Sequence, residues 1–341
     1  MRVAVTGATG NVGTSVLGAL HADTAVEEVV GIARRRPTLV DPKVAWVQAD
    51  VVRDDLVPHF RGADAVIHLA WLIQPARDRA LTRAVNVDGS ARVFRAAADA
   101  GVPALVYASS VGAYSSGPKH ARVDESWPTE GIPSSFYARD KADVERLLDR
   151  FEAEHPEVRT VRLRPALTFK REAAAEIRRL FAGRLLPSRL VRPELIPLVP
   201  KLERLRFQAV HSYDAGEAYR LATVGDARGA FNLAAEPVLD PDELGRLLGA
   251  RPVRVPPAVL RGGASLAWKL RLSPTPPGWV DMALAIPLMD TARARTELGW
   301  EPRHGAGETL LELLDGLRDR AGLQTPPLER NGDGKYPVPI P

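Results

Sequence analysis

Three glycines near the start of the chain restrict what it can fold into. Gly7, Gly10 and Gly13 follow a short apolar run, Val3–Val5, and precede an amphipathic stretch, Val12–Leu20. At this G-x-x-G-x-x-G spacing the first glycine permits a tight turn, the second lets the backbone approach a pyrophosphate, and the third lets helix and strand pack closely. The free N–H groups at the start of such a helix also favour phosphate. The segment therefore predicts a dinucleotide site with contacts from Gly7, Thr9, Gly10, Asn11, Val12 and Gly13.

Short apolar runs alternate with helical patterns through the first half of the chain. The runs predicted as strands are Val3–Val5, Val29–Ile32, Ala45–Gln48, Ala65–Leu69, Ala104–Tyr107 and Thr160–Arg164. The helices predicted between them include Val12–Leu20, Asn86–Ala100 and Ser135–Glu154. Runs that are apolar throughout are typical of strands covered on both faces. The pattern predicts an α/β fold with a doubly wound, parallel, Rossmann-type sheet.

Beyond about Pro165 the alternation loosens, and prolines and arginines become frequent. Residues 1–165 are predicted to form the dinucleotide-binding domain, and residues 166–322 a smaller substrate lobe that partly returns to the main sheet. The elements predicted in this lobe are strands at Phe207–Val210 and Ala230–Leu233 and helices at Asp214–Thr223, Asp240–Leu248 and Thr309–Arg320. Residues 323–341 are rich in proline and are predicted to be an extended tail.

The composition excludes several classes of function. The 341 residues include no cysteine, which rules out thiolate metal sites and cysteine nucleophiles, and no histidine or carboxylate cluster has the spacing of a metal site. The net charge of +4 comes without a basic stripe, so nucleic-acid binding is not expected. No apolar stretch reaches the ~20 residues that span a bilayer, and no leader precedes the first strand. We expect a cytoplasmic protein that contacts no membrane and acts on a small molecule.

The residues after the second predicted strand bear on which dinucleotide binds. NAD-binding folds place an acid on the ribose hydroxyls about 20 residues beyond the glycines. This chain has Gly31–Arg36 there, a segment that contains no acid. Arg34 and Arg35 suit the 2′-phosphate of NADP through charge-assisted hydrogen bonds, or else they are solvated loop charges. NADP is therefore predicted, with NAD as the alternative.

A tyrosine and a lysine at Y-x-x-x-K spacing lie in the helix predicted at Ser135–Glu154. Tyr137 and Lys141 are four residues apart and therefore share a helix face. A phenol with its usual pKa of about 10 is a poor base at neutral pH, and a nearby ammonium lowers that pKa. The pair predicts proton transfer by Tyr137 at a substrate oxygen while hydride moves to or from nicotinamide, with Lys141 also holding the nicotinamide ribose.

The glycine turn and the Tyr–Lys pair together resemble the extended short-chain dehydrogenase/reductase family, which includes NAD-dependent epimerases and dehydratases. The strand end Val106–Tyr114 resembles the family's strand end, where a Ser or Thr lies four residues before a tyrosine. This alignment selects Ser110, with Ser109 as the neighbouring alternative. The resemblance implies that the Ser110 hydroxyl hydrogen-bonds the reacting oxygen.

Shorter matches extend the resemblance over roughly residues 2–320. His68 lies inside one of these matches and is expected to be a packed strand histidine rather than a catalyst. The other matches are Asn86–Ser90, Arg164–Pro165 and Asp290–Pro302. The further cofactor contacts that the resemblance implies are Asp50 and Val51 at the adenine, Leu69 and Ala70 under the cofactor, and Pro165 near the nicotinamide.

The resemblance implies an NAD(P)-dependent oxidoreductase or epimerase that moves hydride at a hydroxyl or carbonyl carbon of a sugar or sugar nucleotide. Val111 and Gly112 stand where dehydratases of the family carry acids, so dehydratase chemistry is not expected. The arginines from Arg171 to Arg206 either hold a substrate diphosphate or are solvated. A homodimer that associates through the Tyr–Lys helix is also implied.

Two alternatives to that function stay open. The first is an NADPH-dependent reductase of a non-sugar ketone or aldehyde, which would use the same Ser110, Tyr137 and Lys141. The second is a non-catalytic dinucleotide sensor, which would need the glycine turn alone. Retention of all three side chains favours an enzyme.

Overall fold

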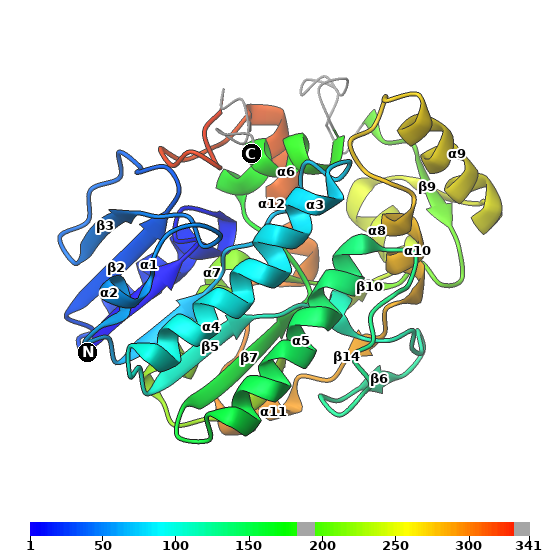
Figure 1. The fold of residues 1–341 in the computed structure, drawn as a ribbon. Coiled ribbons are helices and arrows are strands. Elements are labelled where there is room, and N and C mark those ends of the chain that lie inside the picture. The colour runs from blue at the N-terminus through cyan, green and yellow to red at the C-terminus, as the bar shows by residue number, and fades with distance from the viewer. Residues whose placement is uncertain (183–194, 331–341) are drawn as a thin grey trace.

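The computed structural model describes residues 1–182 and 195–330, and its largest element is a seven-stranded sheet (Figure 1). The strand order is β11-β7-β5-β4-β1-β2-β3, and each neighbouring pair is parallel. The strands are β1 (Arg2–Thr6), β2 (Glu28–Ala33), β3 (Val44–Gln48), β4 (Ala65–His68), β5 (Ala104–Ala108), β7 (Arg159–Pro165) and β11 (Gly229–Leu233). The predicted doubly wound parallel sheet is confirmed.

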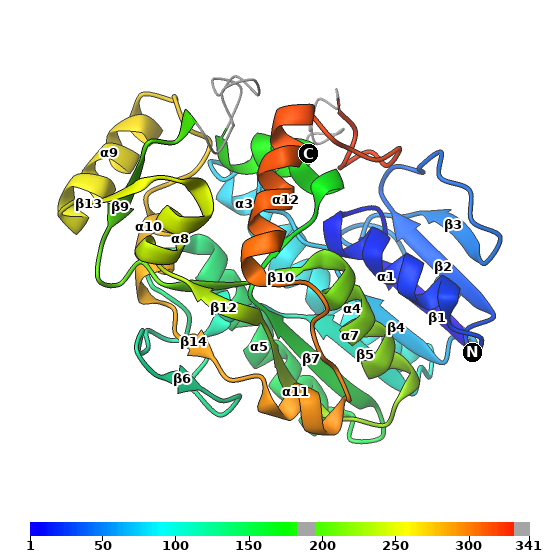
Figure 2. The same cartoon turned by 180° about the vertical axis from the view of Figure 1, so that it is seen from behind.

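Helices cover both faces of this sheet, as Figures 1 and 2 show from opposite sides. On one face α1 and α7 pack against the strands, and Leu20 and Tyr219 join a buried core there. On the other face α4 and α5 enclose a second core that contains Phe94 and Leu148. Burial on both sides explains why the strands are apolar throughout. These helices are α1 (Asn11–Ala22), α7 (Ser212–Val224), α4 (Gly89–Asp99) and α5 (Phe136–Glu154).

The helix predicted at Asn86–Ala100 begins earlier than the sequence pattern indicates. The Asp78 carboxylate accepts the Leu81 N–H at 2.9 Å and caps α3 (Arg79–Arg83). A π-helical turn, Ala84–Asp88, then leads into α4. Because a π turn adds a residue to the helix, the apolar periodicity is interrupted there. The part before the turn therefore escaped prediction.

A smaller lobe contains most of the chain that follows β7. Its short strands form three sheets, in the orders β12-β10-β8, β13-β9 and β14-β6. These strands are β6 (Arg122–Val123), β8 (Leu167–Phe169), β9 (Leu198–Lys201), β10 (Phe207–His211), β12 (Ala235–Leu239), β13 (Arg251–Arg254) and β14 (Leu288–Met289). β11 comes from the same half of the chain but is the edge strand of the main sheet. The boundary predicted at residue 165 between two domains stays a prediction.

The sequence pattern did not predict four helices in this half of the chain, the short α6 and α11 and the longer α9 and α10. The longer two share a feature at their starts. Both are preceded by prolines, which fix the backbone at a helix start. The predicted helices in this half match α7, α8 and α12. The helices are α6 (Ala174–Ile177), α8 (Pro241–Leu248), α9 (Pro257–Lys269), α10 (Gly278–Ala285), α11 (Ala292–Glu297) and α12 (Ala306–Asp319), and the short α2 (Val57–Phe60) belongs to the first half.

The chain after α12 returns to the glycine turn. Between Thr325 and Leu328 it turns, with the Leu328 N–H bonded to the Thr325 O at 2.8 Å, so the described start of the predicted extended tail is a turn instead. Both side chains are fully buried. The Thr325 hydroxyl donates to the Thr9 O at 2.9 Å, and the Thr38 hydroxyl donates to the Gln324 O at 3.4 Å. We call residues 321–330 the C-terminal loop; residues 331–341 lie outside the described part of the chain.

Replacing Thr325 with valine removes the hydroxyl that satisfies the Thr9 carbonyl. We expect Thr325→Val to lower the free energy of unfolding by about 1 kcal/mol, because a buried acceptor loses its donor. Urea denaturation of the purified protein measures the change. Thr38→Val is the matched control, since Thr38 is exposed and its bond to the same loop is longer; its effect should stay below about 0.5 kcal/mol. Equal effects of the two variants would contradict the structural role of Thr325.

Candidate active site

The glycine turn joins β1 to α1 with two glycines in tight contacts. Gly7 has a φ of +72°, and a Cβ there would lie 2.6 Å from the Ala70 N at the end of β4. A Cβ on Gly13 would lie 2.3 Å from the Gly7 O, so only glycine lets α1 pack this closely. A Cβ on Gly10 would have the Gly7 O as its nearest neighbour, at an unstrained 3.6 Å. The turn is therefore packed at Gly7 and Gly13 and unobstructed at Gly10, where the pyrophosphate is expected.

An acidic side chain approaches the start of α1. The Glu176 carboxylate, from α6, lies within hydrogen-bonding reach of the Asn11 N–H. Burial raises the pKa of Glu176 to about 7, although Arg179, Lys170 and the Asn11 N–H all lower it. The Asn11 side chain donates to the Thr168 O at 2.9 Å, and its Oδ1 is buried without a partner. A carboxylate thus lies at the first N–H group that is predicted to bind phosphate.

Arginines from two parts of the chain lie near the end of β2. Arg34 and Arg35 follow this strand and are half-buried, whereas Arg36 is exposed. Burial and the neighbouring Arg35 both lower the pKa of Arg179, which follows α6. The Nη1 of Arg179 donates to the Glu329 O in the C-terminal loop at 2.9 Å. Cations therefore gather where the predicted 2′-phosphate site lies.

The other predicted cofactor residues lie at the carboxyl ends of strands in the main sheet. Because these strands are parallel, their ends meet at one edge of the sheet, where ligands of doubly wound folds bind. The structure thus brings the glycine turn and these residues to the same edge. They are Asp50 and Val51 after β3, Leu69 and Ala70 after β4, and Pro165 at the last position of β7.

Ser110, Tyr137 and Lys141 lie together beyond the end of β5. The Ser110 hydroxyl lies within hydrogen-bonding reach of the Tyr137 phenol and accepts the Gly112 N–H at 3.0 Å. A Cβ on Gly112 would lie 2.8 Å from the Tyr137 ring, so this glycine lets the ring lie against the turn. The Lys141 Nζ donates to the Ala108 O at 2.6 Å and lies 6.0 Å from the centre of the Tyr137 ring. The three predicted catalytic side chains therefore share one site.

The ionisation of Tyr137 differs from the expectation. Burial raises its pKa, and the Ser110 hydrogen bond opposes this rise. Burial also lowers the pKa of Lys141 to about 7, although Glu145 and Asp140 oppose this. The expected lowering of the Tyr137 pKa is therefore wrong for the protein alone, because burial of the phenol outweighs the opposing effect of Ser110. A further positive charge, such as that of an oxidised nicotinamide ring, would favour the phenolate.

Ser109 points away from Tyr137 and into a buried ionic network. Its hydroxyl donates to the Glu145 Oε1 at 2.5 Å. Arg164 donates to both carboxylate oxygens of Glu145, at 2.9 and 3.0 Å, and Arg162 donates to Oε2 at 2.9 Å. Burial would raise the pKa of Glu145, but its bond to Arg164 and the charges of both arginines lower it to about 2. The network fixes α5 against β5 and β7 and leaves Ser110 as the serine that faces Tyr137.

His68 is a packed strand histidine, as expected. It is fully buried, with Nδ1 2.7 Å from the Thr6 hydroxyl and Nε2 2.9 Å from the Ser90 hydroxyl. Burial and the charge of Lys141 lower its pKa to about 3. The imidazole is therefore neutral near pH 7, and both ring nitrogens are already engaged.

Three aromatic side chains that the sequence analysis did not single out surround Tyr137. The rings of Trp71 and Trp279 lie 5.8 and 5.0 Å from the Tyr137 ring, between centroids, and Phe181 meets Trp279 edge-on at 4.9 Å. The Lys141 Nζ lies 3.5 Å above the Trp71 ring. Trp71 directly follows the predicted cofactor residues after β4, so its position was a usable signal. Nothing local in the sequence marks Trp279 or Phe181.

Close packing of α10 on α5 places Trp279 beside Tyr137. A Cβ on Gly278 would lie 2.2 Å from the Ser134 O, so glycine is needed where α10 starts against the start of α5. Farther along α10, the Ala283 O accepts a bond from the buried Lys119 Nζ at 2.9 Å. α10 is thus fixed from both sides, which makes Trp279 a rigid part of the site.

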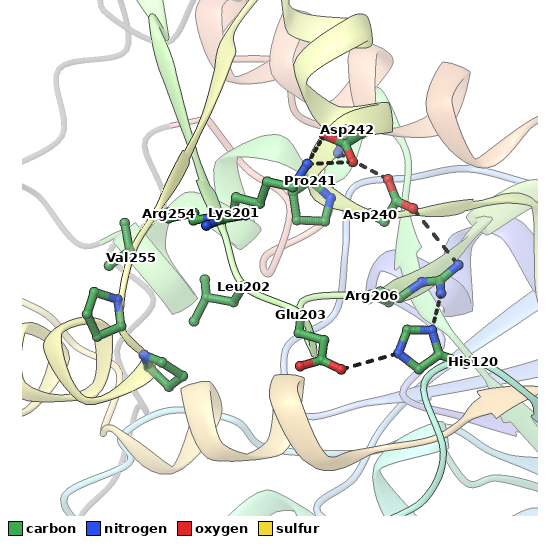
Figure 3. A pocket seen from close by; sticks show the side chains of 12 residues that line it. His120, Lys201, Leu202, Glu203, Arg206, Asp240, Pro241, Asp242, Arg254 and Val255 are labelled. Carbon is green, nitrogen blue, oxygen red and sulfur yellow. Dashed lines mark hydrogen bonds and ion pairs between the residues drawn. The ribbon is translucent and has the colours of Figure 1, made fainter.

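A separate cavity of about 800 Å³ lies in the smaller lobe (Figure 3). Its charged side chains bind one another: Lys201 pairs with Asp242 at 2.6 Å, and Arg206 lies 2.8 Å from the His120 Nδ1. None of the predicted catalytic or cofactor-binding residues lines this cavity, although Arg206, the last arginine of the segment expected to hold a diphosphate, does. The cavity therefore does not belong to the site around Tyr137.

Residues 1–182 and 195–330 contain neither a metal-binding cluster nor a membrane-spanning helix. No group of three or more His, Cys, Asp or Glu side chains there could hold a metal ion. No helix in the same ranges is long and apolar enough to cross a membrane.

The doubly wound sheet, the glycine turn at its ligand-binding edge and the Ser–Tyr–Lys group define an enzyme of the Rossmann-type dinucleotide-binding class. The chain belongs to the NAD dependent epimerase/dehydratase family, which matches residues 3–190. The predicted resemblance is thereby confirmed.

Known proteins resemble the chain at moderate identity. An uncharacterised protein of Mycobacterium tuberculosis is 29% identical over 327 residues, which are 95% of this chain but 31% of that protein, so the chain spans about a third of this relative. A 2-alkyl-3-oxoalkanoate reductase of Shewanella oneidensis is 32% identical over 170 residues, which are 48% of this chain and 43% of the reductase. The structure of UDP-glucose 4-epimerase from Thermotoga maritima with UDP-glucose matches at a TM-score of 0.69 and 19% identity, over 94% of this chain and 99% of that one. This structural similarity supports the fold.

Glu145→Gln tests the ionic network behind the catalytic helix. Removing the charge leaves the buried Arg164 without its counter-ion, whereas Arg162 keeps Asp149 and Glu152, and we expect the free energy of unfolding to fall by about 3 kcal/mol at pH 7. Because the pKa of this carboxyl falls from 4.5 to about 2, its stabilisation is present above pH 4.5 and is lost as the pH falls towards 2. Urea denaturation at several pH values measures both effects. The exposed Glu154 on the same helix is the control, and a loss no larger than that of Glu154→Gln would contradict the role of Glu145.

Glu176 should make dinucleotide binding depend on pH. With a pKa of about 7, its carboxyl is neutral below pH 7 and repels a pyrophosphate above it. We expect NADH to bind about tenfold more tightly at pH 6 than at pH 8. A tenfold change in affinity needs only about 1.4 kcal/mol of repulsion between the carboxylate and the pyrophosphate. Fluorescence titration with NADH measures this. Glu176→Gln should remove the pH dependence and Glu154→Gln should keep it; a Glu176→Gln variant with the wild-type profile would contradict the assignment.

Proposed function

We propose that the chain is an NADP-dependent oxidoreductase that moves hydride between the dinucleotide and a hydroxyl or carbonyl carbon, with Tyr137 as the acid and base. The observation that carries this is that the Ser110 hydroxyl, the Tyr137 phenol and the Lys141 ammonium lie together at the sheet edge that also bears the glycine turn, with Ser110 within hydrogen-bonding reach of Tyr137. The activity of the S. oneidensis relative, a reductase by name, supports reduction of a carbonyl group. A non-catalytic sensor would have no use for this arrangement.

The residues present fit a nicotinamide dinucleotide. The turn at Gly10 is unobstructed, and the buried, unpartnered Asn11 Oδ1 can accept a hydrogen bond from the ligand. Arg34 and Arg35 lie where the 2′-phosphate of NADP is expected, which supports NADP over NAD. The reduced dinucleotide would supply the hydride.

The three side chains beside the substrate would divide the proton chemistry. In reduction, Tyr137 donates its phenolic proton to the carbonyl oxygen as that oxygen gains negative charge. The Ser110 hydroxyl donates a hydrogen bond to the same oxygen and stabilises the charge. Lys141, whose Nζ lies 3.5 Å above the Trp71 ring, would hold the nicotinamide ribose. In the reverse direction, Tyr137 as phenolate accepts the proton of the substrate hydroxyl.

A sugar-nucleotide epimerase is the second candidate, since the T. maritima neighbour was solved with UDP-glucose. The two candidates differ in whether the reaction consumes the dinucleotide. A reductase consumes one NADPH for each product, whereas an epimerase regenerates its dinucleotide in every turnover. The homodimer through α5 also remains a prediction, which sedimentation tests.

Tyr137→Phe removes the proton donor and keeps the ring. We expect turnover of a carbonyl substrate to fall by a factor of about 10² to 10⁴, while NADPH binding changes little. Loss of NADPH absorbance measures turnover, and fluorescence titration measures binding. The exposed Tyr213 supplies a control, and Tyr213→Phe should keep wild-type turnover. Full activity of Tyr137→Phe would contradict the proposed mechanism.

Arg34→Ser and Arg35→Ser test the choice of dinucleotide. Each lost guanidinium should weaken NADPH binding by about tenfold and leave NADH binding within about twofold, because only NADPH carries the 2′-phosphate. The exposed neighbour Arg36 provides the matched control, Arg36→Ser. Tighter binding of NADH than of NADPH by the wild-type chain would contradict the assignment.

A further inference from the structure

The side chains around the Tyr137 phenol are mainly aromatic and come from separate parts of the chain. Trp71 follows β4, Phe181 lies in the π-helical turn Arg178–Ala182, and Trp279 lies in the first turn of α10. Tyr137 has ring contacts with both tryptophans, at 5.8 and 5.0 Å between centroids. Phe181 extends the aromatic surface beyond Trp279: the centroids of these two rings are 4.9 Å apart, and the ring planes are nearly perpendicular. Any compound that reaches the phenol from this side meets ring faces and edges.

Gln74 and Thr275 hold these segments together, whereas the indole N–H groups of Trp71 and Trp279 are buried without a partner. The Gln74 Nε2 donates to both the Leu180 O and the Pro274 O at 2.9 Å, and its Oε1 accepts the Ala76 N–H at 2.8 Å. The Thr275 hydroxyl donates to the Phe181 O at 3.4 Å. These bonds fix the aromatic rings in place, and they leave Gln74 with no spare N–H donor for the hydroxyls of a sugar.

The described arginines of the segment expected to hold a substrate diphosphate are engaged by the protein. Arg171 pairs with Asp319, and Arg179 donates to the C-terminal loop. Arg204 donates to two backbone carbonyls, and Arg206 contacts His120. A diphosphate is recognised by guanidinium groups that point at it, often in bidentate pairs. Arg184, Arg189 and Arg192 lie outside the described residues.

We infer that the compound on which Tyr137 acts is an apolar, ring-bearing ketone or alcohol, held against Trp71, Phe181 and Trp279. The inference rests on the proposed function, because it names the substrate class of that reaction. Flat rings gain from offset or edge-to-face contacts with fixed aromatic side chains, and apolar surface gains from burial, whereas a charged sugar nucleotide would lose hydration without replacement. The carbonyl oxygen of the ketone lies at the hydroxyls of Ser110 and Tyr137.

Binding without turnover tests this directly. The full chain is saturated with NADP⁺, so that no hydride can reach a ketone, and is titrated with 2-acetylnaphthalene or with UDP-glucose by saturation-transfer NMR. We expect the ketone to bind at least about tenfold more tightly than UDP-glucose. Phe181→Ala should weaken ketone binding by about 3- to 10-fold. Phe207→Ala is the matched control, since Phe207 is also half-buried but packs in a separate core of the smaller lobe.

Each outcome decides between the two classes of substrate. Tighter binding of UDP-glucose, or equal ketone binding by the wild-type chain and Phe181→Ala, overturns the inference. Trp279→Leu gives a second test if Phe181→Ala does not fold, with the same expected loss. A different result would contradict the proposed function alone. If the ketone binds in a way that depends on Phe181, but NADPH transfers hydride to no ketone, the apolar site is supported and the oxidoreductase is contradicted.

Discussion

The buried carboxylate of Glu145 is the constraint on which the candidate active site depends. Tyr137, Lys141 and Glu145 are spaced four residues apart and therefore lie along one face of α5. At the far end of that face, Glu145 binds Arg162 and Arg164 of β7 and Ser109 beyond β5. A buried carboxylate requires such partners, so the helix has one stable position on the sheet. That position brings the Tyr137 phenol to Ser110.

The rest of the site is assembled around this helix by two close backbone contacts. Gly278 lets α10 begin against the start of α5 and so places Trp279 at the phenol. Gly7 lets the turn after β1 lie on the end of β4, just before Trp71. The dinucleotide side and the substrate side are thus attached to the same strands. The C-terminal loop adds a third connection, because Thr325 binds the Thr9 carbonyl within the glycine turn.

The sequence predicted those features that depend on local spacing. The glycine turn, the alternation of strands and helices, and the Tyr137–Lys141 pair are set by neighbours along the chain, and the matching family and the structure agree on the fold. The ionisation of Tyr137 could not be predicted, because its raised pKa depends on burial of the phenol by residues distant in the sequence. The choice between Ser109 and Ser110 also needed the structure.

The aromatic residues and the C-terminal loop escaped prediction for a related reason. Phe181 and Trp279 are about 40 and 140 residues from Tyr137 in sequence, and no periodic pattern connects residues that meet only through tertiary packing. Prolines after α12 indicated an extended tail, but the described part turns because Thr325 and Leu328 are buried against the rest of the protein. Long-range burial here overrides a local preference.

Transfer of a labelled hydride tests the central claim most directly. The purified chain is incubated with an apolar ketone and NADPH that carries deuterium at one of the two C4 positions, and the alcohol is analysed by mass spectrometry. The account predicts one deuterium on the new carbinol carbon from one of the two labelled forms and none from the other. Alcohol that contains no deuterium from either form, or no alcohol at all with any ketone and either dinucleotide, would contradict it.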